Sequence, residues 1–487
     1  MSFSFDQLYG NLYLILPEVV LFVLACVVLA LGALGERSSA ALAVWSFLSL
    51  VATAILVAVI GRGSAFGGMF LADNFALVFK LIVLVSAMFT VASSLPTTET
   101  LRAHRGEYYG IVLLSAVGMM FMVSAGELIT MYVALELSTV SLMVLAAYNK
   151  TNTKSAEAGL KYVILGAISS AVLLYGIALM YGLTGTTEIA GLKNGLREMF
   201  FAAGGFPRGF FVAVVLLAAG FGFKLALVPF HMWAPDVYEG APTPITAYLS
   251  VASKAAGLAV FLRVFFSGLI NAQEVWIPVF SVLAALAMIV GNITAVVQKN
   301  IKRMLAFSSI AHVGYILVAV VAANPRGVSS MTLYVMVYLF ANMGAFICAA
   351  AFAQRTGSDL IADYSGLSRR SPALAAFLSV FLLSLAGIPP LAGFVGKYYV
   401  FMAAIEQNYL WLVLIALLTS VIGLYYYAYV VWRMYFPGEG EFPGDPVPVT
   451  PLMRIILGIA ALGVLMIGIY PRPFLDLALA AARAFAQ

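Results

Sequence analysis

The chain has 487 residues, of which 63% are hydrophobic and 10% charged, with a formal net charge of +5. A soluble globular domain is about 45–50% apolar and about 25% charged, so the composition excludes a soluble protein and predicts a polytopic membrane protein. Cys26, Cys348 and the three histidines lack the spacing of a zinc, iron–sulfur or haem site, so no such cofactor is expected in this chain. The basic residues fall mostly in loops, where they orient a membrane protein, and no nucleic-acid partner is expected.

Apolar runs long enough to cross a bilayer recur along the whole chain. A spanning helix needs about 20 mostly apolar residues, and counting such runs between polar breaks predicts an all-α protein of about fourteen spans. We expect these spans at 12–34, 41–61, 72–95, 108–125, 127–147, 158–182, 209–230, 243–268, 274–297, 303–322, 329–354, 372–401, 408–434 and 450–470.

The longest loops are predicted near 183–208 and 435–449, and the Pro/Gly/acid-rich sequence "FPGEGEFPGDPVPVTP" predicts a hairpin in the second. We divide the chain into 1–107 with three N-terminal spans, 108–268 with spans four to eight, 269–434 with spans nine to thirteen, and 435–487 with the hairpin, span fourteen and a C-terminal tail.

The distribution of Lys and Arg predicts the orientation. Loops after odd-numbered spans carry thirteen of these residues, against seven in the loops after even-numbered spans and the C-terminal tail. Because cytoplasmic loops carry the excess of positive charge, both termini are expected on the outer side of the membrane.

Two spans contain prolines in their interior. The seventh carries "FGFKLALVPFHMWAPD" (221–236) and the twelfth "FLLSLAGIPPLAGFVGKYYVF" (381–401), and each also carries one lysine, Lys224 or Lys397. Five helices separate the two spans, and an odd offset reverses the direction of the chain through the bilayer. The pattern predicts two inverted five-helix repeats, spans 4–8 and 9–13, with helices 7 and 12 broken.

Charged residues deep in a span are expensive and mark functional sites by default. Glu136, Lys224, Lys254 and Lys397 lie deep in their spans, and they predict a path for charge transfer. The structural alternative is a set of buried ion pairs that only fix helix packing.

Three further groups of residues are ambiguous from the sequence. Lys161 follows Glu157 by four residues, so it is either an ion-paired surface lysine or a proton carrier. His312 lies mid-span and is either a relay element or a neutral core histidine. Glu18, Lys80 and Arg263 lie nearer to span ends, where long side chains are expected to reach the interface.

Lysines suit a proton path because burial disfavours their charged form, whereas a nearby carboxylate favours it. Glu136 approaching or leaving Lys224 would therefore switch this lysine between holding and releasing a proton. The broken helices leave backbone groups unpaired, and water can enter there.

Five stretches of the chain resemble a known family. They are "MYVALELSTVSLMVLAAY", "EAGLKYVILGAISSAVLLYG", "FGFKLALVPFHMWAPDVYEGAPTPITAYLSVASKAAG", "VVQKNIKRMLAFSSIAHVGYIL" and "SLAGIPPLAGFVGKYYVF". They are similar to the proton-translocating, antiporter-like membrane subunits of respiratory complex I, the NADH:quinone oxidoreductase, and the resemblance covers nearly the whole chain. It implies a non-redox subunit of a translocase, whose NADH, FMN, iron–sulfur clusters and quinone bind to other subunits.

The resemblance also implies a role for each buried titratable residue in a proton relay. It implies a coupling pair in Glu136 and Lys224, a connecting lysine in Lys254, an exit-side lysine in Lys397, an additional lysine in Lys161 and a histidine on the central hydrophilic axis in His312.

Within the family, the chain resembles the N-type branch. The M-type branch has a glutamate where this chain has Lys397, and the L-type branch continues into a long lateral helix beyond the fourteenth span. The resemblance implies a bacterial inner-membrane location, with an M-type subunit, a small K-type subunit, the L-type lateral helix and membrane lipids as neighbours. A subunit of a multisubunit cation/proton antiporter, the plastid or cyanobacterial counterpart, and a mainly structural scaffold remain alternatives.

Overall fold

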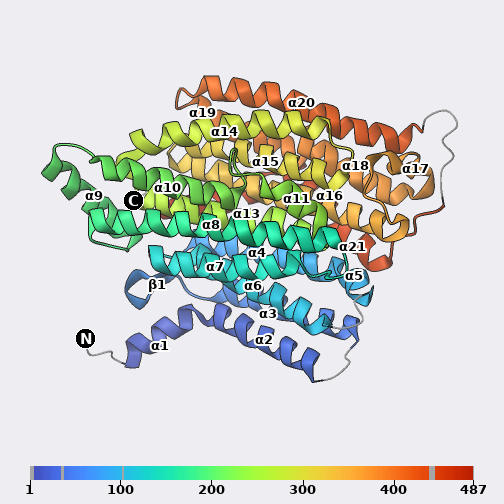
Figure 1. Ribbon diagram of the computed structural model, residues 1–487, viewed down its shortest axis with the longest axis horizontal. Coiled ribbons are helices and arrows are strands. Elements are labelled where there is room, and N and C mark those ends of the chain that lie inside the picture. The colour runs from blue at the N-terminus through green and yellow to red at the C-terminus, as the bar shows by residue number, and fades with distance from the viewer. Residues whose placement is uncertain (1–4, 35–37, 101–103, 438–444, 486–487) are drawn as a thin grey trace.

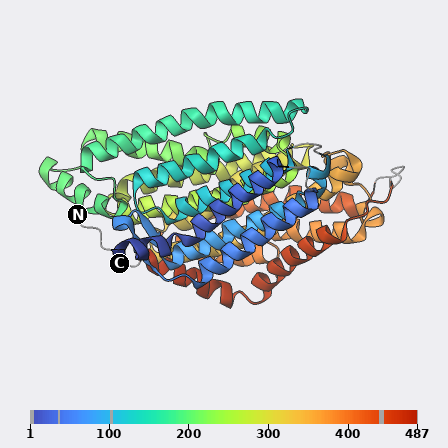
Figure 2. The same cartoon turned by 90° about the horizontal axis from the view of Figure 1, so that it is seen from below.

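The computed structural model describes residues 5–34, 38–100, 104–437 and 445–485. The chain forms a bundle of helices that lie side by side along the longest axis of the molecule (Figure 1). Both ends of the chain lie at the same end of this bundle, and helix α9 (Ile189–Ala203) projects beyond that end (Figures 1 and 2). Arg37 and Arg102, two of the basic residues that predict the orientation, lie outside the described residues.

The remaining helices follow in chain order: α1 (Phe5–Leu14), α2 (Leu16–Ala33), α3 (Ser39–Val59), α4 (Asn74–Ser93), α5 (Leu95–Thr100), α6 (Arg105–Ser124), α7 (Leu128–Ala146), α8 (Thr153–Thr184), α10 (Arg208–Leu225), α11 (Trp233–Gly240), α12 (Thr243–Tyr248), α13 (Lys254–Leu262), α14 (Gln273–Val296), α15 (Ile301–Val321), α16 (Pro325–Thr356), α17 (Leu367–Arg370), α18 (Pro372–Ala386), α19 (Ala392–Ile405), α20 (Leu410–Tyr435), α21 (Pro451–Ile469) and α22 (Arg472–Ala482).

Short elements complete the described structure. Two π-helical segments, η2 (Leu249–Ser253) and η3 (Arg263–Gly268), continue α12 and α13 into one long helix. The 3-10 turns are η1 (Phe66–Gly68), η4 (Ile270–Ala272), η5 (Ile361–Tyr364) and η6 (Arg483–Phe485), and the strands β1 (Gly63–Ala65) and β2 (Phe70–Ala72) pair antiparallel around η1.

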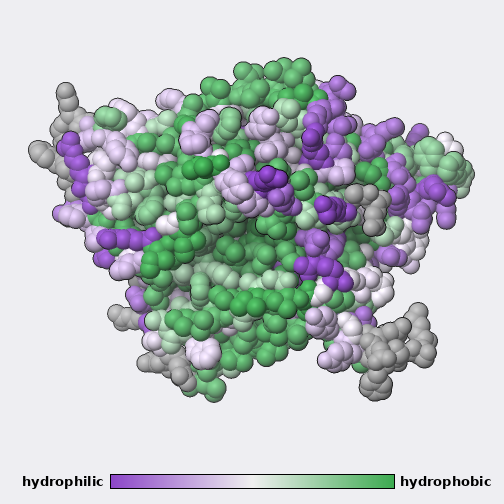
Figure 3. All heavy atoms as spheres, turned by 180° about the vertical axis from the view of Figure 1, so that it is seen from behind, coloured by the Kyte–Doolittle hydropathy of each residue, from purple (hydrophilic) through white to green (hydrophobic). Residues whose placement is uncertain are grey.

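The predicted polytopic fold is confirmed. Thirteen helices of the described chain are long and apolar enough to cross a membrane, and α18 and α19 together form the remaining predicted span. The first span begins at Leu16 rather than residue 12, and the predicted loop at 183–208 contains α9. Residues 438–444 of the predicted hairpin lie outside the described residues. Figure 3 shows a broad hydrophobic surface across the middle of one face, with hydrophilic residues mainly toward the ends of the bundle.

Both predicted breaks are present. Helix α10 ends at Leu225, Ala226 adopts a left-handed conformation with φ 57°, and the chain resumes a helix at Trp233. Helix α18 ends before Gly387, which has φ 92°, and α19 begins at Ala392. The prolines between these helices cannot donate a backbone hydrogen bond, so a continuous helix cannot form there.

Corresponding elements support the inverted repeats. Helices α8 and α16 each contain 32 residues, and each ends at a left-handed glycine, Gly185 or Gly357. The turn before α7 pairs with the segment after α8 by a bridge between Glu127 and Glu188. The turn before α15 pairs in the same way with the segment after α16. The two halves of the chain therefore repeat the same local architecture.

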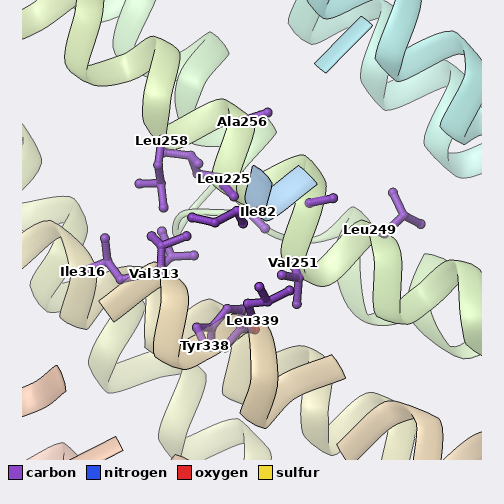
Figure 4. Close-up of a cluster of buried hydrophobic side chains, with 14 of the residues drawn as sticks. Ile82, Leu225, Leu249, Val251, Ala256, Leu258, Val313, Ile316, Tyr338 and Leu339 are labelled. Atoms are coloured by element: carbon purple, nitrogen blue, oxygen red, sulfur yellow. The ribbon is translucent and has the colours of Figure 1, made fainter. Parts of the chain in front are cut away.

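The interior of the bundle is apolar around the first break. Leu225 from α10, Leu258 from α13 and Ile316 from α15 are buried in one cluster (Figure 4). This packing excludes water from most of the interior, so the polar side chains found there are held by specific partners.

Candidate functional site

The first polar group lies where α10 ends. The Lys224 ammonium is buried and donates to Thr139 Oγ1 at 2.9 Å and to Ser138 Oγ at 3.4 Å, both on α7. Its position in the last turn of α10 places its charge near the negative end of the helix dipole. Two hydroxyls and a helix terminus thus hold the lysine.

Glu136 lies on α7, two residues before Ser138 and three before Thr139. It is half-buried, and its carboxylate accepts a hydrogen bond from Ser170 on α8. The described residues show no direct ion pair between Glu136 and Lys224. A cavity of about 10 Å³ is lined in part by Lys224, by its partner Thr139 and by Ser170, the partner of Glu136. It is about the size that one water molecule needs.

The second lysine follows a π-helical segment. Lys254 lies directly after η2, and π-helical turns are frequent at functional sites. Its ammonium is buried, donates to Ser309 Oγ on α15, and lies 5.9 Å from the centre of the Tyr238 ring. Lys254 therefore joins the first repeat to α15 in the second.

Helix α15 carries three polar residues spaced by three positions, Ser309, His312 and Tyr315. This spacing places them on one face of the helix. Ser309 holds Lys254, and the His312 ring nitrogens lie 2.8 Å from the Tyr334 hydroxyl and 3.1 Å from that of Tyr427. All three side chains are buried. The histidine is thus fully hydrogen-bonded and lies midway along a polar strip.

Lys397 lies at the second break. Its ammonium donates to the Ala386 carbonyl at the end of α18 at 2.9 Å and to Ser420 Oγ on α20 at 2.6 Å. It also lies 4.9 Å from the centre of the Tyr315 ring. Like Lys224, Lys397 is bound by a hydroxyl beside a helix break, although Lys224 precedes its break and Lys397 follows its own.

The half-buried Glu136 and the buried residues Lys224, Lys254, His312 and Lys397 together form the buried row of titratable residues. The sequence did not identify the hydroxyl partners of this row. It singled out the lysines, Glu136 and His312, but not the Ser, Thr and Tyr residues that hold them. The spacing in "SSIAHVGY" (308–315) was the available signal, because three polar residues on one face are unusual in an apolar helix.

Lys161 lies apart from this row. Its side chain is 40% exposed, and its ammonium pairs with Glu157 at 2.7 Å and Asp236 at 2.6 Å. Arg303 contacts the same Asp236 at 2.7 Å, and it also contacts Glu239 at 3.0 Å. Lys161 thus belongs to a network of ion pairs between α8, α11 and α15.

The expectation that Glu18, Lys80 and Arg263 reach the interface is wrong. Glu18 and Lys80 form an ion pair of 2.6 Å with 0% and 4% of their side chains exposed. Arg263 is also buried and binds both oxygens of Asp73, at 3.0 and 2.9 Å. Helix α4 follows Asp73 and carries Lys80, so one helix provides a partner to each ion pair.

The loop residue Asp73 shows how strongly such a pair acts. Burial alone would raise the pKa of its carboxyl, but the Arg263 guanidinium and the Ala76 backbone N–H outweigh burial and lower this pKa below its ordinary value. The described residues contain no group of three His, Cys, Asp or Glu side chains that could hold a metal ion.

Comparison with known proteins identifies the class to which this fold and buried row belong. Residues 125–423 match the membrane-spanning family described as NADH:quinone oxidoreductase/Mrp antiporter. A chain of the Mrp complex from Dietzia sp. superposes with a TM-score of 0.84 at 20% identity, over 98% of both chains, which shows the shared fold. The protein is an antiporter-like membrane subunit.

Full-length relatives define the family more closely. NADH-quinone oxidoreductase subunit N of Moorella thermoacetica is 44% identical over 98% of this chain and 99% of its own. The Rhodospirillum rubrum subunit N is 41% identical over 96% of both chains. A chain of respiratory complex I from Thermus thermophilus with bound Aureothin superposes with a TM-score of 0.80 at 32% identity, over 95% of this chain and 99% of that chain. The chain belongs to the NADH-quinone oxidoreductase subunit N family.

Proposed function

We propose that this chain translocates protons in the membrane arm of an NADH:quinone oxidoreductase, through a relay formed by Glu136, Lys224, Lys254, His312 and Lys397. One observation carries the proposal. Helix α15 contacts Lys254 of the first repeat through Ser309 and Lys397 of the second through Tyr315, with His312 between them. A row of titratable and hydroxyl side chains on and beside α15 thus extends from Lys254 of the first repeat to Lys397 at the second break.

The partners of the lysines suit proton transfer. A hydroxyl both accepts and donates, so it can stabilise an ammonium and then rotate to pass a proton on. The Glu136 charge favours the protonated form of Lys224, and losing that charge favours release toward Lys254. His312 has two ring nitrogens bonded to tyrosine hydroxyls, an arrangement that permits transfer along the strip.

Two cavities at opposite ends of α15 support an entry and an exit. One of about 580 Å³ opens at its amino-terminal end, between the α7–α8 and α11–α12 loops. The other, of about 620 Å³, opens at its carboxyl-terminal end, between the α15–α16 and α19–α20 loops. The inverted repeat relates these pairs of loops. In the proposed orientation, with both termini on the periplasmic side of the bacterial inner membrane, the first cavity faces the cytoplasm.

The proposed subunit needs an external source of energy. Moving one proton against 100 mV costs about 2.3 kcal/mol, and we place the redox chemistry, with NADH, FMN, iron–sulfur clusters and quinone, in other subunits. Relatives named as subunits of complex I support such an assembly. We propose an M-type subunit, a small K-type subunit, the L-type lateral helix and lipids as neighbours. The outward apolar residues of α7 and α8, among them Val133, Leu137 and Ile168, offer contact surface.

Alanine variants of Lys224 and Glu136 test the proposal. Quinone-linked proton pumping in membrane vesicles is expected to fall in both, while the complex still assembles. Lys193→Ala, on the exposed face of α9, is the matched control and is expected to pump normally. Full pumping in both Lys224→Ala and Glu136→Ala would contradict the proposed relay and would favour a mainly structural role for the subunit.

A further inference from the structure

The short helix α11 contacts the surroundings of two relay lysines at once. Trp233, its first residue, donates its ring N–H to the Phe223 carbonyl at 3.0 Å, one residue before Lys224. Tyr238, on the same helix, places its ring 5.9 Å from the Lys254 ammonium. The eight residues of α11 therefore contact the surroundings of both Lys224 and Lys254, the two lysines of one proposed proton-transfer step.

Two acidic residues fix the position of α11. Asp236 and Glu239 are three residues apart, so they share a face of the helix. Arg303 bridges both carboxylates, at 2.7 and 3.0 Å, from α15 in the second repeat. Lys161 holds Asp236 at 2.6 Å and Lys154 holds Glu239 at 2.7 Å, both from α8 in the first repeat. The four contacts tie α11 to both halves of the protein.

The helix is also tightly packed against α8. The Trp233 ring stacks on Tyr162, with ring centres 4.7 Å apart and planes only 5° apart. A Cβ atom at Gly240 would lie 2.2 Å from the Lys154 carbonyl oxygen, so only glycine permits this approach. A cavity of about 100 Å³ lies among the charged side chains. Because Trp233 and Tyr238 belong to the same short helix, the ion pairs that position α11 also position both of these rings.

We infer that Asp236, Glu239, Arg303 and Lys161 form an electrostatic latch that positions α11, and through Trp233 and Tyr238 controls proton transfer between Lys224 and Lys254. Lys161 is then a positioning residue rather than a proton carrier. The inference rests on the proposed function. It adds that the two repeats are coupled by ion pairs at one end of the bundle as well as by the buried row.

The test compares Arg303→Met, which breaks both contacts to α11, with Arg303→Lys, which can hold only one carboxylate at a time. Glu406→Gln is the control, because it breaks the exposed ion pair with Arg326 at the opposite end of the bundle. Each variant is made in the whole complex. Proton pumping per quinone reduced and hydrogen–deuterium exchange over residues 233–240 are measured.

In Arg303→Met, pumping is expected to fall to the level of Lys224→Ala. Exchange over α11 is expected to rise by more than about tenfold, because two hydrogen bonds to charged groups are lost and one alone would account for about tenfold. Arg303→Lys is expected to restore part of both properties, and Glu406→Gln to change neither. Trp233→Phe, which keeps the stacked ring but removes the donor, should lower pumping without raising the exchange.

The outcomes separate this inference from the proposed function. If Lys224→Ala abolishes pumping but Arg303→Met pumps normally, the latch is wrong and the relay stands. If exchange over α11 rises in Arg303→Met while pumping is unchanged, the ion pairs only stabilise the helix, and the inference is again wrong. Full pumping in Lys224→Ala would contradict the proposed function itself.

Discussion

Replacing Glu18 by leucine is expected to destabilise the protein by about 3–5 kcal/mol, because the change leaves the Lys80 ammonium buried without an opposite charge. The two side chains lie 2.6 Å apart and are 0% and 4% exposed, so water cannot take the place of the lost partner. The Phe70 ring, 4.6 Å from the Lys80 ammonium, remains as a cation–π partner and keeps the loss within this range.

Lys80→Met should cost a similar amount, because it leaves the Glu18 carboxylate buried and unpaired. Replacing both residues together, by Leu and Met, removes both charges and keeps apolar volume. The free energy of unfolding of the double variant is therefore expected to be at most about 1 kcal/mol below that of the unsubstituted protein, or to exceed it. The two single effects are thus expected to be strongly non-additive.

The assay is a double-mutant cycle on the assembled complex in detergent, with unfolding of this subunit followed against denaturant. Proton pumping of the double variant is measured in parallel and should be normal, since the pair holds α2 to α4 and stands outside the relay. Additive single effects, within about 0.5 kcal/mol, would show that the ion pair does not act as a unit and would refute the reasoning. Lost pumping in a stable double variant would instead place the pair in a proton path.

Two further predictions concern other buried cations. Tyr315→Leu removes the ring beside Lys397, whereas Tyr315→Phe keeps it. Because a desolvated cation–π contact is worth about 2 kcal/mol, Tyr315→Leu should lower proton pumping more than Tyr315→Phe. Equal pumping in the two variants would count against a role for the ring. Asp73→Asn leaves Arg263 without its anion and should lower the free energy of unfolding by about 3 kcal/mol at neutral pH. Because the pKa of Asp73 is lowered in the fold, this stabilisation is complete above about pH 4, the ordinary range of an aspartate, and is lost as the pH falls through the lowered value. The difference in free energy of unfolding between Asp73→Asn and the unsubstituted protein should therefore be full at pH 7 and should shrink as the pH is lowered below about 4.

The sequence predicted those features that depend on one helix at a time. The spans follow from apolar run length, the two breaks from Pro229 and the Pro389–Pro390 pair, and the candidate relay from single charges within apolar runs. Such signals are local, because a proline or a lysine in a span is unusual whatever lies beside it.

Features that depend on two helices could not be read in the same way. Glu18 and Lys80 looked like interfacial residues because each lies near a span end. Only the tertiary fold, in which α2 and α4 both pack against α3 and α6, brings them together. Ser309 and Tyr315 were missed because hydroxyl residues are common and inexpensive in membrane helices. Their importance comes from the lysines that other helices place against them.

The membrane-buried cations of this chain fall into two groups by their partners, and this division explains which of them suit a relay. Lys80 and Arg263 are paired with carboxylates, and an opposite charge at this distance favours the charged form of a cation. In the described structure the ammonium groups of Lys224, Lys254 and Lys397 contact hydroxyls, a backbone carbonyl and aromatic rings.

A neutral partner costs little when the lysine loses its proton, because a hydroxyl can turn from acceptor to donor. A carboxylate partner would instead be left as an uncompensated charge. Glu136 is consistent with this argument, since it affects Lys224 without forming a direct ion pair with it. Introducing a carboxylate beside Lys254, by Ser309→Asp, should therefore leave a folded and assembled protein in which the lysine holds its proton and pumping stops. A Ser309→Asp variant that pumps at the normal rate would show that the nature of the partner does not decide which lysines transfer protons.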